Sequence, residues 1–263
     1  FIFNQYIDYK YRKIIHKYDK KDFNSNINDE KQKQLFENGC LFLNNFFGEE
    51  VTRNFTDNIA WKGSETSVKK ISPTIIKKNS LVHKLLINKE LNNYILNYIG
   101  QNAKLDHVEI QRIEKNSENK SISEKWHFDN VGKRLKVFFY LNDCDDIYTE
   151  YLNKTNKILH SRYSIKSSRV SGKKLSNHLK NLTTFYPRKN SLLIIDTNGY
   201  HRGVYRNLDN IKNKESFREM IVIEYSDIKK SEMFYGTSNI IGPRNTYFDK
   251  NINLDEILLE KKY

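Results

Sequence analysis

Residues 1–100 carry apolar side chains at helical spacing. Residues 30–38 follow Asn28-Asp29, begin with an acid and end at Gly39, which predicts a short helix with a glycine stop. Residues 49–61 and 80–99 repeat apolar positions three and four apart, and the second stretch also ends at a glycine, Gly100. The pattern therefore predicts amphipathic helices in this part of the chain.

After Gly100 the pattern changes to short runs of β-branched and aromatic residues, separated by Asn, Gly, Lys and Ser. Helices followed by many short strands favour a mainly β (α+β) protein, a jelly-roll barrel buttressed by helices. The polar stretches 144–157 and 166–181 are expected to be long connections. The predicted strands are 104–113, 134–141, 158–165, 182–186, 191–197, 203–206 and 217–225.

A length of 263 residues fits one domain, and three prolines in the whole chain leave no place for a Pro-rich linker. We expect residues 1–100 to form a mostly helical buttress and residues 101–226 to form the jelly-roll core. Within that core, 144–181 is expected to be an inserted loop region. Residues 227–263 are expected to be a C-terminal extension.

The composition indicates a cytoplasmic protein. Hydrophobic residues make up 38% of the chain and aromatic residues 13%, so Tyr and Phe must supply much of the core. Two cysteines, Cys40 and Cys144, form no disulfide framework, and both thiols are expected to be reduced. The sequence contains no apolar run of membrane-spanning length, and its first residues lack the apolar core of a signal peptide.

The net charge of +13 raises the question of a nucleic-acid partner. The lysines are scattered in ones and twos, mostly beside Asn or Ser, which is typical of the compositional drift of an AT-rich genome. An anionic small molecule is therefore the expected partner, and nucleic acid is not. The sequence carries no signal for an oligomeric state.

Two His-x-acid patterns occur, His127-x-Asp129 and His107-x-Glu109. On an extended chain, residues two apart point to the same face, so either pair fits a metal site or a half-buried histidine with a hydrogen-bonding neighbour. A third ligand is available in His201, which follows a predicted strand and a Thr-Asn-Gly turn. Two His and one carboxylate on one face leave the opposite face of an octahedral Fe(II) free for a cosubstrate and oxygen.

A 2-oxoglutarate cosubstrate also needs a fixed cation for its far carboxylate. Arg218 begins the strongly apolar predicted strand 217–225. An arginine there can extend to solvent, or its planar fork can bind a carboxylate with two hydrogen bonds. Beside the His-x-Asp pattern and a later strand-borne histidine, the second role is expected.

The order of "WHFD", "FFYLND", "TEYLNKTNK", "SLLIIDTNGYHRG" and "FREMIVIEY" resembles the phytanoyl-CoA dioxygenase family of Fe(II)/2-oxoglutarate oxygenases. The resemblance covers residues 35–226 and begins with "LFENGCLFLNNFF". It implies a double-stranded β-helix in which His127, Asp129 and His201 bind the metal and Arg218 binds 2-oxoglutarate. It also favours His127 over His107, which has no matching distal partner.

The chain departs from the family pattern in two places. Residues 153–156 read NKTN where the family usually has a Gly-rich segment ending in Gly-Ser-His or Gly-Thr-His, and the loop between His201 and Arg218 is longer than usual. Both departures concern the substrate loops and leave the metal set intact. Because residue 129 is Asp rather than Ala or Gly, no ligand position is vacated for halide, so hydroxylation or a related oxidation is expected.

Alternation along the predicted strands gives further candidates. Lys136, Phe138 and Tyr140 share one face, and the resemblance places Phe138 near the cosubstrate. Gln111 can hydrogen-bond the cosubstrate or lie exposed. Trp126 can wall the substrate pocket or fill the core, and we expect it to wall the pocket.

The substrate itself is indicated only by charge. The 144–181 connection is rich in Lys and Arg, including Arg162 and Arg169, and such a stretch beside an iron centre favours an anionic small molecule. The same charges can also do no more than solvate a long loop. A second interpretation of the whole chain is a jelly-roll barrel that binds a ligand or nucleic acid and has lost catalysis.

Overall fold

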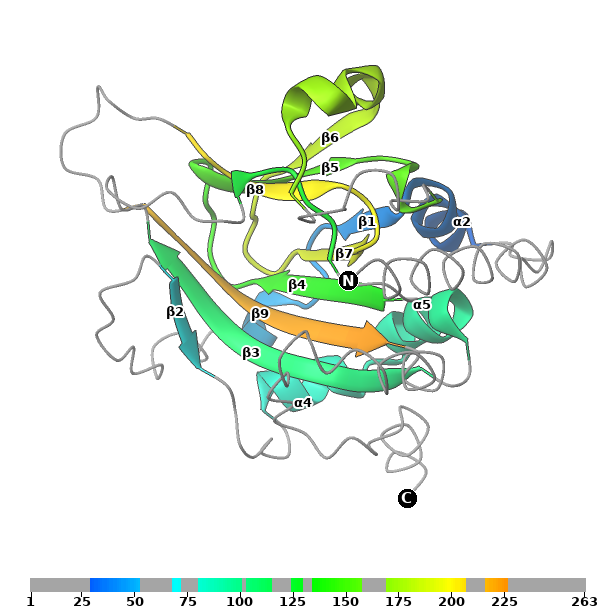
Figure 1. Ribbon diagram of the computed structural model, residues 1–263. Coiled ribbons are helices and arrows are strands. Elements are labelled where there is room, and N and C mark those ends of the chain that lie inside the picture. The colour runs from blue at the N-terminus through cyan, green and yellow to red at the C-terminus, as the bar shows by residue number, and fades with distance from the viewer. Residues whose placement is uncertain are drawn as a thin grey trace, which may run out of the picture.

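The computed structural model describes residues 29–52, 68–71, 80–100, 103–114, 124–129, 134–157, 169–206 and 216–226. The larger of its two sheets has six antiparallel strands, and the smaller has three (Figure 1). The larger sheet has the order β1 (Cys40–Leu43), β7 (Leu192–Asp196), β4 (Arg134–Tyr140), β9 (Phe217–Ser226), β3 (Lys104–Glu114) and β2 (Val68–Ile71). The smaller has the order β6 (Leu182–Phe185), β5 (Ile147–Leu152) and β8 (His201–Tyr205).

The chain passes back and forth between the two sheets. After β4 in the larger sheet come β5 and β6 in the smaller one, then β7 in the larger, β8 in the smaller and β9 in the larger. His127 adds to the free edge of β8 through an isolated antiparallel bridge to His201. Among the described residues, the α-helices precede β4 along the chain, and the segments after it include two 3₁₀ helices.

Side-chain alternation gives the larger sheet two apolar faces. One face meets the smaller sheet in a buried cluster that includes Tyr140, Ile147, Tyr151, Leu193, Met220 and Val222. The other face packs against the helices and includes Leu135, Val137, Ile194, Ile221, Leu85 and Ile95. The interior between the sheets is therefore separated from the helix-covered core by the larger sheet itself.

Within the described residues, the helices α2 (Glu30–Asn38), α4 (Leu81–Leu86) and α5 (Lys89–Ile99) supply several buried side chains to the core. α2 begins at Asp29, whose side chain accepts from Lys31 N, and ends at Gly39 with φ 79°, a left-handed conformation that suits glycine. α4 and α5 lie beside the larger sheet, on the side away from β5, β6 and β8 (Figure 1).

The predicted helix 80–99 is two helices in the structure. The Asn88 side chain accepts a hydrogen bond from Leu91 N at 2.9 Å and so starts α5 afresh. The amide of Asn92 donates to the carbonyl of Leu86 at 2.9 Å and caps the end of α4. Two asparagine side chains therefore interrupt an apolar pattern that continues across the break.

The 144–157 stretch was predicted as a connection, and this prediction is wrong for residues 147–152, which form β5, the middle strand of the smaller sheet. The strand reads IYTEYL and has polar segments on both sides, which is why the sequence pattern indicated a connection. Likewise 172–181 is a 3₁₀ segment, η5 (Gly172–Asn181), and β2 was not predicted. In the predicted helix 49–61, α3 (Glu49–Thr52) is described; the rest of it, the predicted strand 158–165 and the extension 227–263 lie outside the described residues.

Candidate metal centre

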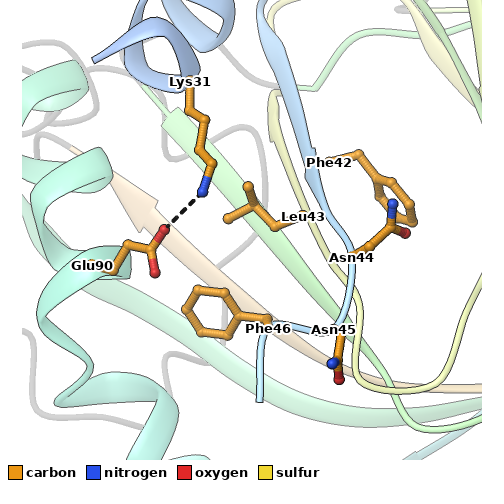
Figure 2. Close-up of a pocket in the computed structure, with 7 residues that line it drawn as sticks. All are labelled: Lys31, Phe42, Leu43, Asn44, Asn45, Phe46 and Glu90. Atoms are coloured by element: carbon orange, nitrogen blue, oxygen red, sulfur yellow. Dashed lines mark hydrogen bonds and ion pairs between the residues drawn. The ribbon is translucent and has the colours of Figure 1, made fainter. Parts of the chain in front are cut away.

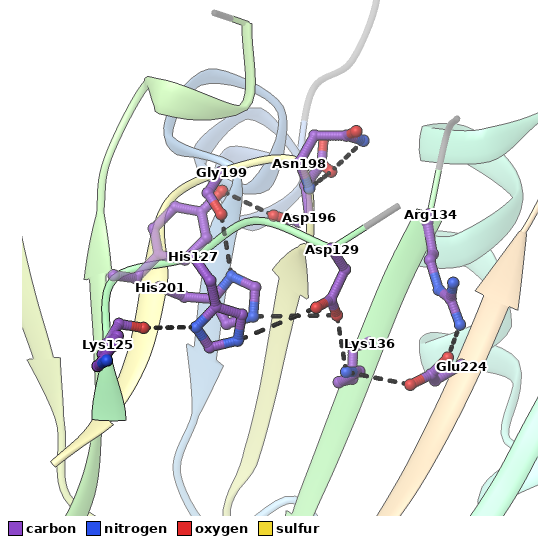
Figure 3. A network of polar contacts seen from close by, with 11 residues as sticks. Lys125, His127, Asp129, Arg134, Lys136, Asp196, Asn198, Gly199, His201 and Glu224 are labelled. Atoms are coloured by element: carbon purple, nitrogen blue, oxygen red, sulfur yellow. Dashed lines mark hydrogen bonds and ion pairs between the residues drawn. The ribbon is translucent and has the colours of Figure 1, made fainter. Parts of the chain in front are cut away.

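Three potential metal ligands converge beside β8 (Figure 3). His127 N donates to His201 O at 3.0 Å and His201 N donates to His127 O at 2.9 Å, so the two histidines lie directly opposite each other. Asp129 follows two residues later, and its backbone N donates to Thr197 O at 2.8 Å. The ligand atoms of the three side chains all lie within 4.8 Å of one another. Within the described ranges, this is the one group of three or more His, Cys, Asp or Glu residues with such geometry.

Both imidazoles are held with the same nitrogen turned toward the shared space. His127 Nδ1 lies 2.7 Å from the carbonyl oxygen of Lys125, and His201 Nδ1 lies 2.9 Å from that of Gly199. Because a carbonyl only accepts, each Nδ1 carries the proton and each Nε2 keeps its lone pair. Each Nε2 lies 4.0 Å from an oxygen of Asp129. The arrangement directs two nitrogen donors and one carboxylate at one point.

The protonation states suit a cation. Burial and the neighbouring His201 lower the pKa of His127 to about 3, and burial also lowers the pKa of His201. Burial opposes ionisation of Asp129, but the Lys136 ammonium, 2.9 Å from Oδ2, outweighs it and holds the pKa of Asp129 well below its usual range. At neutral pH the site therefore presents two neutral imidazoles and a carboxylate, the forms in which these groups bind metals.

The turn that delivers His201 is fixed by buried polar contacts. Tyr98 Oη donates to Asp196 Oδ2 at 2.6 Å, and Tyr151 Oη donates to the Asp196 carbonyl at 3.0 Å. Gly199 packs so closely on Tyr151 that a Cβ at this position would overlap the tyrosine hydroxyl. The glycine of "DTNGYH" is therefore required by packing, and its carbonyl also orients the His201 ring.

Gly199→Ala should displace this turn and weaken metal binding by about 10-fold or more, the effect typical of losing an outer partner of a metal-binding histidine. Tyr151 is fully buried and cannot move aside freely, so overpacking should also cost about 1–3 kcal/mol of unfolding free energy. Manganese titration and thermal unfolding measure the two effects. Gly48→Ala is the matched control, because a Cβ there meets nothing within 4 Å. Wild-type metal affinity in Gly199→Ala would contradict the role of the turn.

Arg218 is a buried cation on the interior face of β9. It is 6% exposed, and its Nη1 donates to Thr149 Oγ1 at 3.2 Å. Its Nε has no hydrogen-bond partner within the part of the chain that the structure describes. Among the described residues it has no ion pair with an acid, although a buried charge is costly unless it is paired. Thr149 was missed in the sequence because it belongs to β5. The hydroxyl and the guanidinium together form a position suited to an anion.

The other predicted site residues lie in different parts of the structure. Phe138 is half-buried and packs on the cluster between the sheets, and Gln111 is buried and donates to Glu109. Arg169 forms an isolated backbone bridge with His127, and its guanidinium is near enough to lower the pKa of both histidines. Arg162 lies outside the described residues.

Trp126 is not grouped with these side chains. It is 4% exposed and belongs to a separate apolar cluster with Phe128, Leu152 and Tyr200. Its neighbour His127 points to the metal group, and consecutive residues of an extended segment point to opposite sides. Of the two roles considered from the sequence, core filling is the one that this location supports.

A cavity of about 290 Å³ lies elsewhere, between α2, α5 and the segment after β1 (Figure 2). Lys31 and Glu90 form a 3.4 Å ion pair at its edge, and both side chains are about half exposed. It contains none of the predicted site residues.

Comparison with known proteins gives a likeness at the level of the fold. No protein-family model and no curated protein matches the sequence. A similar solved structure is HygX from Streptomyces hygroscopicus with nickel and 2-oxoglutarate bound, with TM-score 0.52 and 13% identity over 76% of this chain and 87% of that chain. The epimerase SnoN, in complex with Fe3+, alpha ketoglutarate and nogalamycin RO, has TM-score 0.53 and 10% identity over 75% and 82%. The non-heme alpha ketoglutarate dependent carbocyclase SnoK from nogalamycin biosynthesis has TM-score 0.53 and 15% identity over 77% and 85%.

At these identities the likeness establishes a shared, mostly antiparallel β fold and carries no residue assignments. None of the helices in the described ranges has the length and apolar character that crossing a membrane requires.

Proposed function

We propose that the chain is an Fe(II)/2-oxoglutarate-dependent oxygenase of the phytanoyl-CoA dioxygenase-like type. The observation that carries the proposal is the convergence of His127, Asp129 and His201, with both Nε2 atoms turned to one point. Two solved structures of similar fold, HygX and SnoN, contain nickel or iron together with 2-oxoglutarate. Fold alone fixes no chemistry, so the proposal rests on the site.

The fold we propose is a double-stranded β-helix. The alternation of β4 to β9 between two facing sheets supports it, as does the addition of the His127 segment to the edge of β8. In such a barrel, ligands from facing strand ends meet inside one mouth. This arrangement agrees with the His-x-Asp segment and β8 supplying all three metal ligands.

The donor set fits iron better than a structural metal. Two imidazoles and one carboxylate on one side form the facial triad of non-haem Fe(II) oxygenases, which leaves other coordination positions open. His127, Asp129 and His201 would hold the ion, and the bound iron would supply oxygen activation and oxidative decarboxylation of the 2-oxo acid. The protein's part is to keep both imidazoles neutral and oriented and to keep the carboxylate ionised.

We assign Arg218 to the far carboxylate of 2-oxoglutarate. Its guanidinium is buried, and no described residue partners its Nε, so an incoming carboxylate would satisfy both the charge and this donor. Thr149 can add a hydroxyl donor to the same carboxylate. Phe138 would line the space between the two ends of the cosubstrate, and Gln111 would donate to it from β3.

For the substrate we propose a small anionic molecule that is oxidised at an aliphatic C–H. Arg169, close to both histidines, would contribute to its recognition, together with Arg162. The competing function is a barrel of the same shape that binds a ligand without turnover.

Succinate formation with Fe(II), ascorbate and 2-oxoglutarate tests the proposal. We expect slow succinate release without substrate, and faster release when a metabolite pool contains the substrate, with mass gains of one oxygen in the product. Asp129→Ala provides the matched blank, because it removes one ligand and leaves Arg218 in place. Binding of 2-oxoglutarate without succinate release under any pool would favour the non-catalytic barrel instead.

A further inference from the structure

A network of charged side chains extends from Asp129 through Lys136 and Glu224 to Arg134 (Figure 3). Lys136 Nζ lies 2.9 Å from Asp129 Oδ2 and 3.1 Å from Glu224 Oε1, and Glu224 also pairs with Arg134. The side chains are 6–21% exposed, so water screens these contacts only partly. Lys136, Glu224 and Arg134 are not among the residues that we assigned above to the metal or to the cosubstrate.

The register of β4 against β9 brings these charged side chains together. Lys136 of β4 lies directly opposite Glu224 of β9. Arg134, two residues before Lys136 and therefore on the same face of β4, lies opposite Ser226. Two basic residues therefore flank the acid of the neighbouring strand. Glu224 holds the ammonium of Lys136 near the start of β4, a central strand of the larger sheet, and Asp129 reaches it from a different segment.

We propose that Lys136 is a positioning residue that makes Asp129 a one-oxygen metal ligand, an inference that rests on the proposed function. The ammonium engages Oδ2 at 2.9 Å, an oxygen that also lies 4.0 Å from His201 Nε2. Oδ1 lies 4.0 Å from His127 Nε2 and is left without the ammonium, so it is the oxygen that remains free to bind the metal. A carboxylate that bound through both oxygens would fill a further coordination position, and the 2-oxo acid and oxygen need the open ones. Outer partners of metal-binding side chains fix ligand orientation in this way.

A simple charge-balancing role predicts a different result. If Lys136 acted only as a nearby positive charge, its removal would reduce repulsion of a divalent cation, and the metal would bind more tightly with unchanged coordination. If Lys136 positions Asp129, its removal changes the coordination of the bound metal, whatever happens to affinity. Coordination number is therefore the readout that separates the two roles.

The test uses Co(II), whose visible absorption depends on coordination number, added to the full chain without 2-oxoglutarate. Lys136→Met should change the Co(II) spectrum toward higher coordination and weaken 2-oxoglutarate binding to the metal-loaded protein by about 10-fold. Lys136→Arg should restore the wild-type spectrum, because it keeps a cation between the two acids. Lys31→Met is the matched control, since Lys31 also pairs with a glutamate, 3.4 Å away at Glu90, far from the site.

An unchanged Co(II) spectrum in Lys136→Met overturns the inference, and so does an altered spectrum that Lys136→Arg fails to restore, because packing of the stem would then be the cause. If Lys136→Met does not fold, Glu224→Gln replaces it, and the same spectral change is expected because the ammonium loses its anchor. A wild-type chain that binds neither Co(II) nor 2-oxoglutarate would refute the proposed function itself, an outcome distinct from these.

Discussion

His201→Ala should abolish metal binding and 2-oxoglutarate turnover together. The side chain supplies one of the two nitrogen donors, and its Nε2 is already aimed at the shared point by the bond from Nδ1 to the Gly199 carbonyl. Losing an outer partner typically costs 10–100-fold in metal affinity, so losing a ligand should cost more than about 100-fold. Anaerobic Fe(II) titration and succinate release measure the two losses.

Thermal unfolding gives a second readout of the same variant. A ligand present at about 100 times its dissociation constant stabilises the native state by about 2.7 kcal/mol. Added Mn(II) should therefore raise the unfolding temperature of the wild type and leave that of His201→Ala unchanged. The metal-free variant should still unfold cooperatively, because the backbone pair between His127 and residue 201 does not use the side chain.

The control for this variant is the other His-x-acid pattern. His107 lies in β3, where its backbone is paired opposite Glu224 of β9. His107→Ala should keep most of the Fe(II) affinity and most of the turnover. If the two variants exchange behaviour, the choice of His127-x-Asp129 over His107-x-Glu109 is wrong.

The three metal ligands could be predicted from the sequence because their placement depends on short stretches of residues. The spacing of His127 and Asp129 puts both on one face of an extended segment, and the turn before His201 is written in the residues "DTNGYH". Contacts between distant segments were not accessible in the same way. The Lys136 pair with Asp129 requires the register of β4 against β9, which no single stretch of sequence encodes.

The missed β5 has a similar cause. Its six residues, IYTEYL, lie between the polar stretches NDCDD and NKTNK, and composition averaged over the whole window indicates a loop. Without β5 there was no strand to carry Thr149 toward Arg218. Trp126 shows the opposite case, because alternation beside His127 already places it on the other side of the segment, and this rule was available from the sequence alone.

Arg218→Lys should weaken 2-oxoglutarate binding markedly while Fe(II) still binds. An ammonium keeps the charge but offers no planar fork for two parallel hydrogen bonds to a carboxylate. Truncating one partner of a buried, hydrogen-bonded charge pair costs about 2–5 kcal/mol, which predicts a fall in affinity of at least about 30-fold. The measurement is 2-oxoglutarate titration of the Mn(II)-loaded protein.

Arg188→Lys is the matched control for that exchange. Arg188 forms a 2.7 Å ion pair with Asp145, but its side chain is 47% exposed, so the exchange should leave 2-oxoglutarate affinity unchanged. An unchanged affinity in Arg218→Lys as well would move the anchor elsewhere. Arg134 and Lys136 are then the next candidates, although both already pair with Glu224.

Arg218→Met separates a binding role from a structural one. A buried guanidinium with one hydroxyl partner carries a desolvation cost, and replacing a buried charge by an apolar side chain of similar volume is often neutral or stabilising. The ligand-free variant should therefore unfold at the same temperature as the wild type or higher, while 2-oxoglutarate no longer stabilises it. A structural arginine would give the reverse pattern, a lower unfolding temperature with 2-oxoglutarate affinity retained. A dedicated carboxylate site should lower the stability of the ligand-free protein, because its buried charge lacks an acidic partner. Bound 2-oxoglutarate should then relieve that cost.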